Sequence, residues 1–316
     1  MSSPLLEVRE LSVSYRSAGR VIRALTGVSL SLARGQTLGI VGESGCGKST
    51  LGRAVLRLVD ADSGQVLFED TDITRHSRAA MRPLRTRMQM VFQDPFGSLN
   101  PRRSAADLIA EPLRIHGRGD ATAQAARVAE LLAQVGLQPQ HGTRLPHEFS
   151  GGQRQRIGIA RALALEPELL VCDEPVSALD VSVRAQILNL LVDAQRRYGL
   201  AMLFISHDLS VIRYVSDEVA VLYLGRVVER GPADALFESP RHPYTRALIA
   251  SVPSTERPGE AFGDRELAAG DVPDPASPPS GCAYRTRCPQ AGARCAEQVP
   301  ELRPLARQQV ACHFAE

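Results

Sequence analysis

The chain has 316 residues, with 37 Lys and Arg against 35 Asp and Glu, a formal net charge of +2, and 44% hydrophobic residues. This composition excludes disorder over most of the chain, and near-neutral charge without tryptophan speaks against nucleic acid as a partner. The length predicts about two domains, and the apolar runs are far shorter than the ~20 residues of a membrane span.

Short apolar runs alternate with helical patterns along the first 250 residues. Several runs are continuous, as expected for strands buried on both faces of a sheet. These runs lie at residues 38–41, 88–92, 169–172, 202–205 and 219–224. Apolar residues at helical spacing predict helices after residue 180 and near residues 128–135. Strand and helix in repeated succession indicate an α/β fold with a largely parallel sheet.

Two segments depart from this alternation. Residues 94–165 have little strand signal and helical pieces broken by prolines, so we expect a helical subdomain there. Beyond residue 250 the composition shifts: nine of the 21 prolines lie between 253 and 304, and four of the six cysteines in the last 35 residues. We therefore predict a domain over residues 1–250 and a proline- and cysteine-rich extension over residues 251–316.

Residues 42–50, GESGCGKST, match the phosphate-loop pattern G-x-x-x-x-G-K-[ST] between a predicted strand and a predicted helix. Backbone N–H groups and the helix N-terminus would face a phosphate, Lys48 would contact the β and γ phosphates, and Ser49 would bind Mg²⁺. The alternative, a glycine-rich turn that binds nothing, does not require Lys-Ser-Thr at the helix start. The predicted ATP-binding residues of this loop are Gly42, Ser44, Gly45, Cys46, Gly47, Lys48, Ser49 and Thr50.

Two acidic residues, Asp173 and Glu174, follow the apolar run 169–172. Carboxyl ends of parallel strands meet at one edge of a sheet, so we expect both beside the phosphate loop. Asp173 would lie near Mg²⁺, and Glu174 near the γ phosphate, where a carboxylate can polarise an attacking water. The alternative is a pair of solvated acids at a strand end.

Residues 149–156, FSGGQRQR, resemble the signature sequence of the nucleotide-binding subunits of ABC transporters, and the resemblance covers roughly residues 5–250. It implies an ABC-type phosphate-loop ATPase fold. It also implies that Tyr15 stacks on adenine and that His207 is the switch histidine. Taken singly, Tyr15 could be a surface tyrosine and His207 a loop histidine with its hydrogen bonds satisfied.

The resemblance assigns further residues. Gln93 corresponds to the Q-loop glutamine, which joins Ser49 and Asp173 at Mg²⁺ and links nucleotide state to the transmembrane partner, although a glutamine there could also be a plain loop residue. Asp180 lies in the D-loop. The implied catalytic set is Glu174 as general base, with His207, Lys48 and Gln93.

The signature also implies that two subunits share each nucleotide. Ser150, Gly151 and Gly152 form a backbone nest that leads into a helix from Gln153, which is a second anion site. It lies about 100 residues from Lys48. In the family this site closes on the γ phosphate held by the opposite subunit, so ATP favours the closed pair and hydrolysis reverses the closure.

Flanking sequences narrow the resemblance to the second ATPase subunit of bacterial dipeptide and oligopeptide importers, chiefly PRHPYTRAL at residues 240–248 and the tail GCAYRTRCP. This implies peptide import, with a second ATPase subunit expected to be a different chain, two transmembrane permease subunits and an extracytoplasmic peptide-binding protein as partners. It also implies a peripheral position at the cytoplasmic face of the inner membrane. Three alternatives remain: import of nickel or another small solute, a soluble ABC ATPase outside transport, and a metal-binding module with a vestigial ATPase.

The opening residues lack a basic stretch and an apolar core, so we expect no signal peptide and a reducing compartment. The tail cysteines, Cys282, Cys288, Cys295 and Cys312, are then candidate metal ligands at spacing C-x5-C-x6-C-x16-C. The resemblance implies a [4Fe-4S] cluster, with Zn²⁺ and free or oxidised thiols as alternatives. Cys46 and Cys172 lie among small and apolar residues, which indicates packing.

Overall fold

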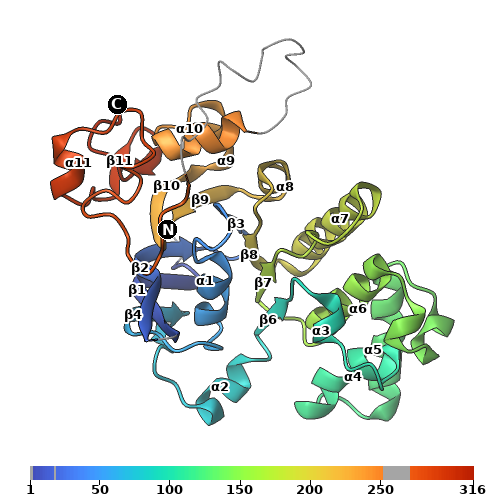
Figure 1. The fold of residues 1–316 in the computed structure, drawn as a ribbon. Helices are drawn as coiled ribbons and strands as arrows, with labels where there is room; N and C mark the ends of the chain where they lie inside the picture. Colours follow the sequence, from blue (N-terminus) through green and yellow to red (C-terminus); the bar gives the residue numbers. More distant parts are fainter. Residues whose placement is uncertain (1–2, 18, 252–270) are drawn as a thin grey trace. The chain divides into compact units, whose positions relative to one another are not determined.

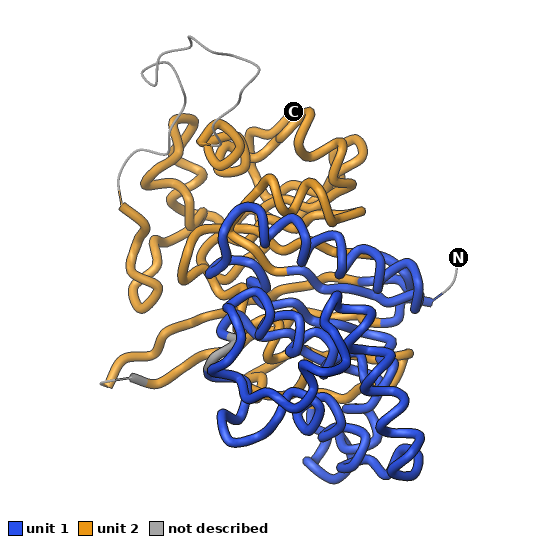
Figure 2. Tube along the Cα trace, turned by 90° about the vertical axis from the view of Figure 1, so that its right-hand side faces the viewer, with its two compact units in different colours: residues 1–5, 32–36, 75–204 blue, residues 6–31, 37–74, 205–316 orange. Residues whose placement is uncertain are grey.

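The computed structural model describes residues 3–17, 19–251 and 271–316, and the chain forms two compact units (Figures 1 and 2). Unit 1 consists of residues 1–5, 32–36 and 75–204, and unit 2 of residues 6–31, 37–74 and 205–316. Residues 252–270 of the predicted extension lie outside the described residues, and its described part, 271–316, belongs to unit 2. Among the described residues, no helix combines the length and apolarity needed to span a membrane.

Over its described residues, unit 2 has an antiparallel sheet, a second group of strands and five helices. The sheet, in the order β2-β1-β4-β5, comprises β1 (Leu6–Ser17), β2 (Arg20–Leu32), β4 (Ser63–Phe68) and β5 (Thr71–Asp72). The second group, in the order β11-β12-β10-β9-β3, comprises β3 (Thr37–Val41), β9 (Glu218–Tyr223), β10 (Arg226–Pro232), β11 (Arg303–Leu305) and β12 (Gln308–Val310). The helices are α1 (Lys48–Val55), α8 (Leu209–Val215), α9 (Ala233–Glu238), α10 (Pro243–Ala250) and α11 (Ala293–Glu297). β3 and β9 are parallel, whereas β9, β10, β12 and β11 pair antiparallel in succession.

Unit 1 has three neighbouring strands and most of the long helices. The strands, in the order β8-β7-β6, are β6 (Met88–Val91), β7 (Leu169–Asp173) and β8 (Ala201–Ile205), and β6 pairs with β7 in parallel. The α-helices are α2 (Arg78–Leu84), α3 (Pro95–Ser98), α4 (Ala105–Ile115), α5 (Ala121–Gln134), α6 (Gly151–Leu163) and α7 (Val181–Tyr198). Two 3₁₀ helices, Pro139–Thr143 and Pro146–Glu148, precede α6. Between β6 and β7 the chain forms helices and turns without a strand.

The continuous apolar runs form the buried strands, which confirms the predicted α/β fold. β3, β7 and β8 are buried along their whole length. The antiparallel strands β1, β2 and β4 were not predicted, because none is a continuous buried run. β1 and β2 alternate buried and more exposed residues, and β4 is buried only over its last three residues. In β1, for example, Leu6 and Val8 are buried, whereas the next residue, Arg9, is exposed. Such alternation is the pattern of a sheet with one solvated face.

Candidate functional site

The phosphate loop connects β3 to α1 in unit 2. Gly47 adopts φ 105°, in the left-handed region that favours glycine, and a Cβ there would lie 2.2 Å from the carbonyl oxygen of Ala24. A Cβ on Gly42 would lie 2.2 Å from the carbonyl oxygen of Leu222. Neighbouring backbone therefore requires glycine near both ends of the loop, and this packing fixes the path of the residues between them.

Lys48 is the buried cation of this loop. It is 5% exposed, and its Nζ donates to the carbonyl oxygen of Gly42 at 2.7 Å and to that of Glu43 at 2.9 Å. Helix α1 begins at Lys48, so the N–H groups of its first turn belong to the same loop. An ammonium group and the positive end of a helix dipole thus meet at the loop, which suits a phosphate chain.

Two further predicted residues belong to unit 2. The hydroxyl of Tyr15 lies 3.3 Å from Oγ1 of Thr50, so the structure brings the predicted adenine-stacking ring beside the phosphate loop. His207 is exposed and follows β8. The next residue, Asp208, caps α8 by accepting from the N–H of Ser210 at 2.9 Å, and this cap fixes the turn that carries His207.

The predicted carboxylates belong to unit 1. Asp173 is 1% exposed at the end of β7, and Glu174 follows at φ 46°, an uncommon conformation for a residue other than glycine. The side-chain amide of Gln93 donates to Oε2 of Glu174 at 3.0 Å. Asp180 is the N-cap residue of α7. The structure therefore joins two predicted catalytic residues, Gln93 and Glu174, and backbone strain at Glu174 is typical of functional positions.

The signature residues form the start of α6, also in unit 1. Oγ of Ser150 accepts from the N–H of Gln153 at 3.3 Å, and Oε1 of Gln153 accepts from the N–H of Ser150 at 3.0 Å. This reciprocal capping box satisfies two of the backbone donors at the helix start. A Cβ on Gly152 would lie 2.4 Å from a methyl carbon of Val183 in α7. Glycine is thus required here for close packing of α6 on α7 as well as for an anion nest.

The structure divides the predicted ATP-site residues between the two units. Unit 2 contains Tyr15, the loop 42–50 and His207, whereas unit 1 contains Gln93, the signature residues 150–153, Asp173, Glu174 and Asp180. The roles of these residues in binding ATP stay predictions.

Three residues at the phosphate loop were missed from the sequence: Glu43, Tyr244 and Arg287. The N–H of Glu43 donates to the hydroxyl of Tyr244 at 2.9 Å, and the Glu43 carboxylate accepts two hydrogen bonds from Arg287 at 2.7 and 2.9 Å. Tyr244 lies in the PRHPYTRAL segment and Arg287 in the tail, each of which served only to indicate the family. No local pattern relates either residue to the loop, because 201 and 244 positions separate them from Glu43.

The tail cysteines belong to unit 2, and among the described residues none of them is paired in a disulfide. The N–H of Cys282 donates to the carbonyl oxygen of Cys295 at 2.8 Å. Burial raises the pKa of Cys282 to about 11, and nearby Cys295, Cys288 and Cys312 add to this rise. Over residues 3–17, 19–251 and 271–316, however, no three His, Cys, Asp or Glu side chains form a group able to hold a metal ion, so the predicted [4Fe-4S] cluster has no support here.

The upstream cysteines are buried, as packing residues are. Cys46 is 4% exposed and Cys172 is 0% exposed. Burial raises the pKa of both thiols. Neither is therefore a reactive thiolate.

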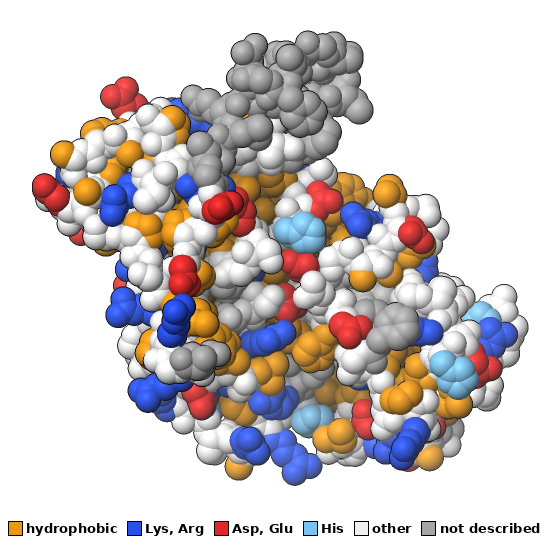
Figure 3. Space-filling view, viewed as in Figure 1, with side chains coloured by type: hydrophobic (Ala, Val, Ile, Leu, Met, Phe, Trp, Pro, Cys, Tyr) orange, Lys and Arg blue, Asp and Glu red, His pale blue; other side chains and the backbone are white. Residues whose placement is uncertain are grey.

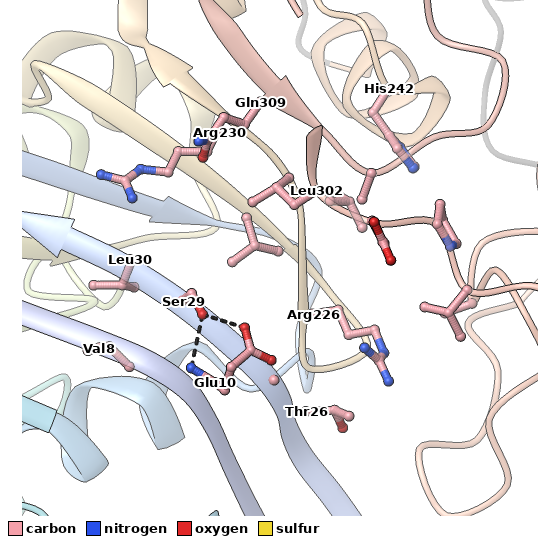
Figure 4. A pocket seen from close by; sticks show the side chains of 18 of the residues that line it. Val8, Glu10, Thr26, Ser29, Leu30, Arg226, Arg230, His242, Leu302 and Gln309 are labelled. Atoms are coloured by element: carbon pink, nitrogen blue, oxygen red, sulfur yellow. Dashed lines mark hydrogen bonds between the residues drawn. The ribbon is translucent and has the colours of Figure 1, made fainter. Parts of the chain in front are cut away.

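A cavity of about 720 Å³ lies apart from the phosphate loop. Residues of β1, β2 and β10 line it together with residues of the tail, and Figure 4 shows Glu10 hydrogen-bonded to Ser29 at its wall. Acidic and basic residues line it in equal number, namely Glu7, Glu10 and Glu301 against Arg9, Arg226 and Arg230. Both signs also occur over the face drawn in Figure 3. Balanced charge defines no ligand class for this cavity.

Two family models match the chain. Residues 25–177 match the model described as ABC transporter, and residues 228–295 match the model described as oligopeptide/dipeptide transporter, C-terminal region. A putative peptide import ATP-binding protein of Brucella ovis is 52% identical over 96% of this chain and 95% of its own length. The oligopeptide transport ATP-binding protein AppF of Bacillus subtilis is 52% identical over 93% of this chain and 90% of its own length. The di/tripeptide transport ATP-binding protein DppF of Pseudomonas aeruginosa is 50% identical over 93% of this chain and 91% of its own length.

Solved structures of ATP-binding cassettes have the same fold. A dimeric post-hydrolysis state of a cassette bound to ADP and Pi superposes with a TM-score of 0.67, at 27% identity, over 72% of this chain and 98% of the other. The cassette cbiO1 of Clostridium perfringens, described as part of an ABC transporter complex, gives a TM-score of 0.67 at 29% identity, over 75% and 92%.

Proposed function

Because the chain belongs to the ATP-binding subunits of ABC-type peptide transporters, we propose that it hydrolyses ATP to drive peptide import through a membrane permease. The observation that carries this proposal is identity of at least 50% over more than nine-tenths of the chain to relatives named for peptide transport. An intact phosphate loop, with Lys48 held inside it, argues against a vestigial ATPase.

The chain's own residues supply the chemistry of hydrolysis. Lys48 and the α1 N-terminus neutralise phosphate charge that builds up on the leaving group. Glu174 takes a proton from the attacking water, and the amide of Gln93 fixes the orientation of that carboxylate through their 3.0 Å hydrogen bond. The Ser49 hydroxyl and the Asp173 carboxylate are oxygen donors of the kind that Mg²⁺ prefers, and the ion bound there would neutralise the phosphates further.

Turnover requires a second ATPase subunit. The signature residues 150–153 present a helix N-terminus, and we propose that it binds the γ phosphate of the nucleotide held by the partner. The similarity to a dimeric cassette bound to ADP and Pi supports this arrangement. His207 then contacts the same phosphate, and Tyr15 stacks on the adenine. Loss of the phosphate on hydrolysis removes the interaction that holds the pair closed.

The remaining partners follow from the same role. We propose a different chain as the second ATPase, two transmembrane permease subunits, and an extracytoplasmic peptide-binding protein that acts through them. The subunit would lie at the cytoplasmic face of the membrane. Residues 1–250 would form the cassette, with a helical subdomain at about 94–165 and an extension over 251–316. Relatives named for oligopeptide and for di/tripeptide transport support peptides as the solute without fixing their length.

The four tail cysteines are proposed as one thiol site. The backbone hydrogen bond from the N–H of Cys282 to the carbonyl oxygen of Cys295 at 2.8 Å supports this for two of the four. A [4Fe-4S] cluster is the first occupant to test, with Zn²⁺ and free thiols as the other outcomes. Anaerobic purification should give a brown protein with visible thiolate-to-iron absorption. Colourless protein with stoichiometric zinc, or with four titratable thiols and no metal, would refute the iron cluster.

Reconstitution with the permease and binding protein tests the transport role. ATP turnover is measured while dipeptides, longer peptides or nickel complexes are added, and Glu174→Gln serves as the matched inactive control. Stimulation by peptides that is lost in the control supports peptide import. Stimulation by nickel alone would favour the alternative solute, and turnover indifferent to every solute would contradict the importer function.

A further inference from the structure

The phosphate loop carries an acidic residue whose side chain is neutralised from the tail. Arg287 is 8% exposed, and its two terminal nitrogens donate to the two carboxylate oxygens of Glu43 at 2.7 and 2.9 Å. This paired geometry is the strongest arrangement available to a guanidinium and a carboxylate, and it fixes orientation as well as distance. The tail therefore holds a residue of the phosphate loop in one position.

A second contact holds the backbone of the same residue. The hydroxyl of Tyr244 accepts from the N–H of Glu43 at 2.9 Å, and Tyr244 is fully buried near the start of α10. That start is fixed by His242, whose Nδ1 accepts from the N–H of Tyr244 at 3.0 Å. The buried carboxylate of Glu229 in β10 accepts from the N–H of His242 at 3.0 Å. The segment 240–248 thus positions a hydroxyl against the loop.

An aromatic cluster joins these two contacts. The rings of Tyr223, Tyr244 and Tyr284 have centroids 4.6 to 5.4 Å apart. The Arg287 guanidinium lies 5.9 Å from the centroids of Tyr223 and Tyr284. Tyr223 ends β9, whereas Tyr284 and Arg287 come from the tail, so the tail is packed on the strand beside the loop.

Glu43 also contacts the catalytic lysine. Its carbonyl oxygen accepts from Nζ of Lys48 at 2.9 Å, so a displacement of Glu43 changes the surroundings of that ammonium. Its carboxylate, without Arg287, would be an uncompensated negative charge in a loop built for a polyanion, and like charges at short range repel. Arg287 therefore acts on ATP through Glu43 in two ways, by position and by charge.

We propose that Arg287 is a positioning residue for ATP binding, through which the C-terminal tail sets the affinity of the phosphate loop for nucleotide. This inference rests on the proposed ATPase function. Arg287 does not contact the nucleotide; it neutralises Glu43 and fixes the loop that does.

The test measures ATP affinity of the full-length chain and the KM and kcat of the reconstituted complex. Arg287→Ala should weaken ATP binding and raise KM by at least about tenfold, the size expected for loss of a hydrogen-bonded charge pair, with a smaller change in kcat. Arg287→Lys, which keeps the charge and loses the paired geometry, should fall between wild type and Arg287→Ala. Arg285→Ala is the matched control, because Arg285 in the same tail donates to Ser280 within the tail. It should bind ATP like the wild type.

A double-mutant cycle separates positioning from general loss of structure. In a Glu43→Gln background the charge to be neutralised is absent, so Arg287→Ala should change ATP affinity by no more than about twofold. A full tenfold loss in that background, or unchanged affinity of Arg287→Ala, would overturn the proposal. If Arg287→Ala does not fold, the same cycle is run with Arg287→Lys. A wild-type complex that lacks peptide-stimulated turnover would refute the proposed function instead, since ATP affinity is measured independently on the isolated chain.

Discussion

Two tyrosines of the aromatic cluster differ in the hydrogen bonding of their hydroxyls, and this difference predicts opposite effects of one substitution. The Tyr244 hydroxyl accepts from the N–H of Glu43 at 2.9 Å. The Tyr284 hydroxyl is buried, and within the described ranges it has no hydrogen-bond partner. Tyr244→Phe and Tyr284→Phe each remove a single oxygen and leave the ring in place, so ring packing is common to both variants.

The expected magnitudes follow from the partner that each change leaves behind. Tyr244→Phe leaves the part-buried N–H of Glu43 without its acceptor. The loss should lower the free energy of unfolding by about 1–2 kcal/mol, which is the lower part of the range for an unpaired buried donor. Tyr284→Phe removes a hydroxyl whose burial no hydrogen bond offsets, so the free energy of unfolding should stay the same or rise. The midpoint of unfolding should therefore fall by about 1–3 °C for Tyr244→Phe only.

Calorimetry without nucleotide gives the midpoints, and near-ultraviolet circular dichroism checks that the cluster persists. The chain has six tyrosines and no tryptophan, so this signal reports heavily on the three clustered rings. A larger loss of stability in Tyr284→Phe than in Tyr244→Phe would refute the reasoning. Equal losses would do so as well, because they would assign the effect to packing.

Three other predictions concern unit 1. Glu174→Gln should bind ATP with near-normal affinity, trap the closed pair and reduce turnover by about 10²–10⁴-fold, as read by phosphate release and by gel filtration with ATP; normal turnover in the complex would remove Glu174 as general base. Gly152→Ala should destabilise the chain by about 1–3 kcal/mol in urea because of its clash with α7, whereas Gly158→Ala in the same helix, whose Cβ meets nothing within 4 Å, should be neutral or stabilising. Arg87 and a second arginine lower the pKa of Glu168 from 4.5 to about 2, so this group stabilises the fold above pH 4.5 and loses its effect as the pH falls from 4.5 toward 2. The free energy of unfolding of the wild type should exceed that of Glu168→Gln by about 1 kcal/mol at pH 7, a value discounted for partial exposure of Glu168. The two free energies should converge near pH 2–3, and a difference that stays constant as the pH falls would contradict a stabilising role of the Glu168 carboxylate.

Sequence reasoning succeeded where a local pattern carries the physical requirement. A continuous apolar run identifies a strand buried on both faces, and three such runs are the fully buried β3, β7 and β8. The phosphate loop was recognisable because glycines, lysine and a hydroxyl residue follow one another in the chain. A hydrogen bond joins Gln93 and Glu174, whereas the roles that the family resemblance gave to both residues stay predictions.

It failed where the requirement is long-range. The strands β1 and β2 alternate buried and more exposed residues, and β4 is buried only over its last three residues, so none of them gives the signal of a continuous buried run and they escaped prediction. The support of the phosphate loop by Tyr244 and Arg287 was invisible, because a contact across 201 or 244 positions leaves no trace in one sequence. The metal site predicted at the tail cysteines gains no support from the described residues, because spacing suggests ligands and cannot fix the distances between them.

An acid inside a phosphate loop is unfavourable on its own, and this gives the distant contacts a common cause. Two unit charges 4 Å apart repel by about 4 kcal/mol at the effective dielectric constant near a protein surface, so a bare Glu43 would oppose the very ligand the loop is shaped to bind. The paired hydrogen bonds from Arg287 cancel that charge, and they exist only while the tail is docked on the tyrosine cluster. Because of Glu43, the affinity of the loop for ATP therefore depends on the tail. With a neutral residue at position 43, the loop would bind ATP whether or not Arg287 is in place. The role of Glu43 is therefore to make ATP affinity depend on Arg287, and not to bind the phosphates itself.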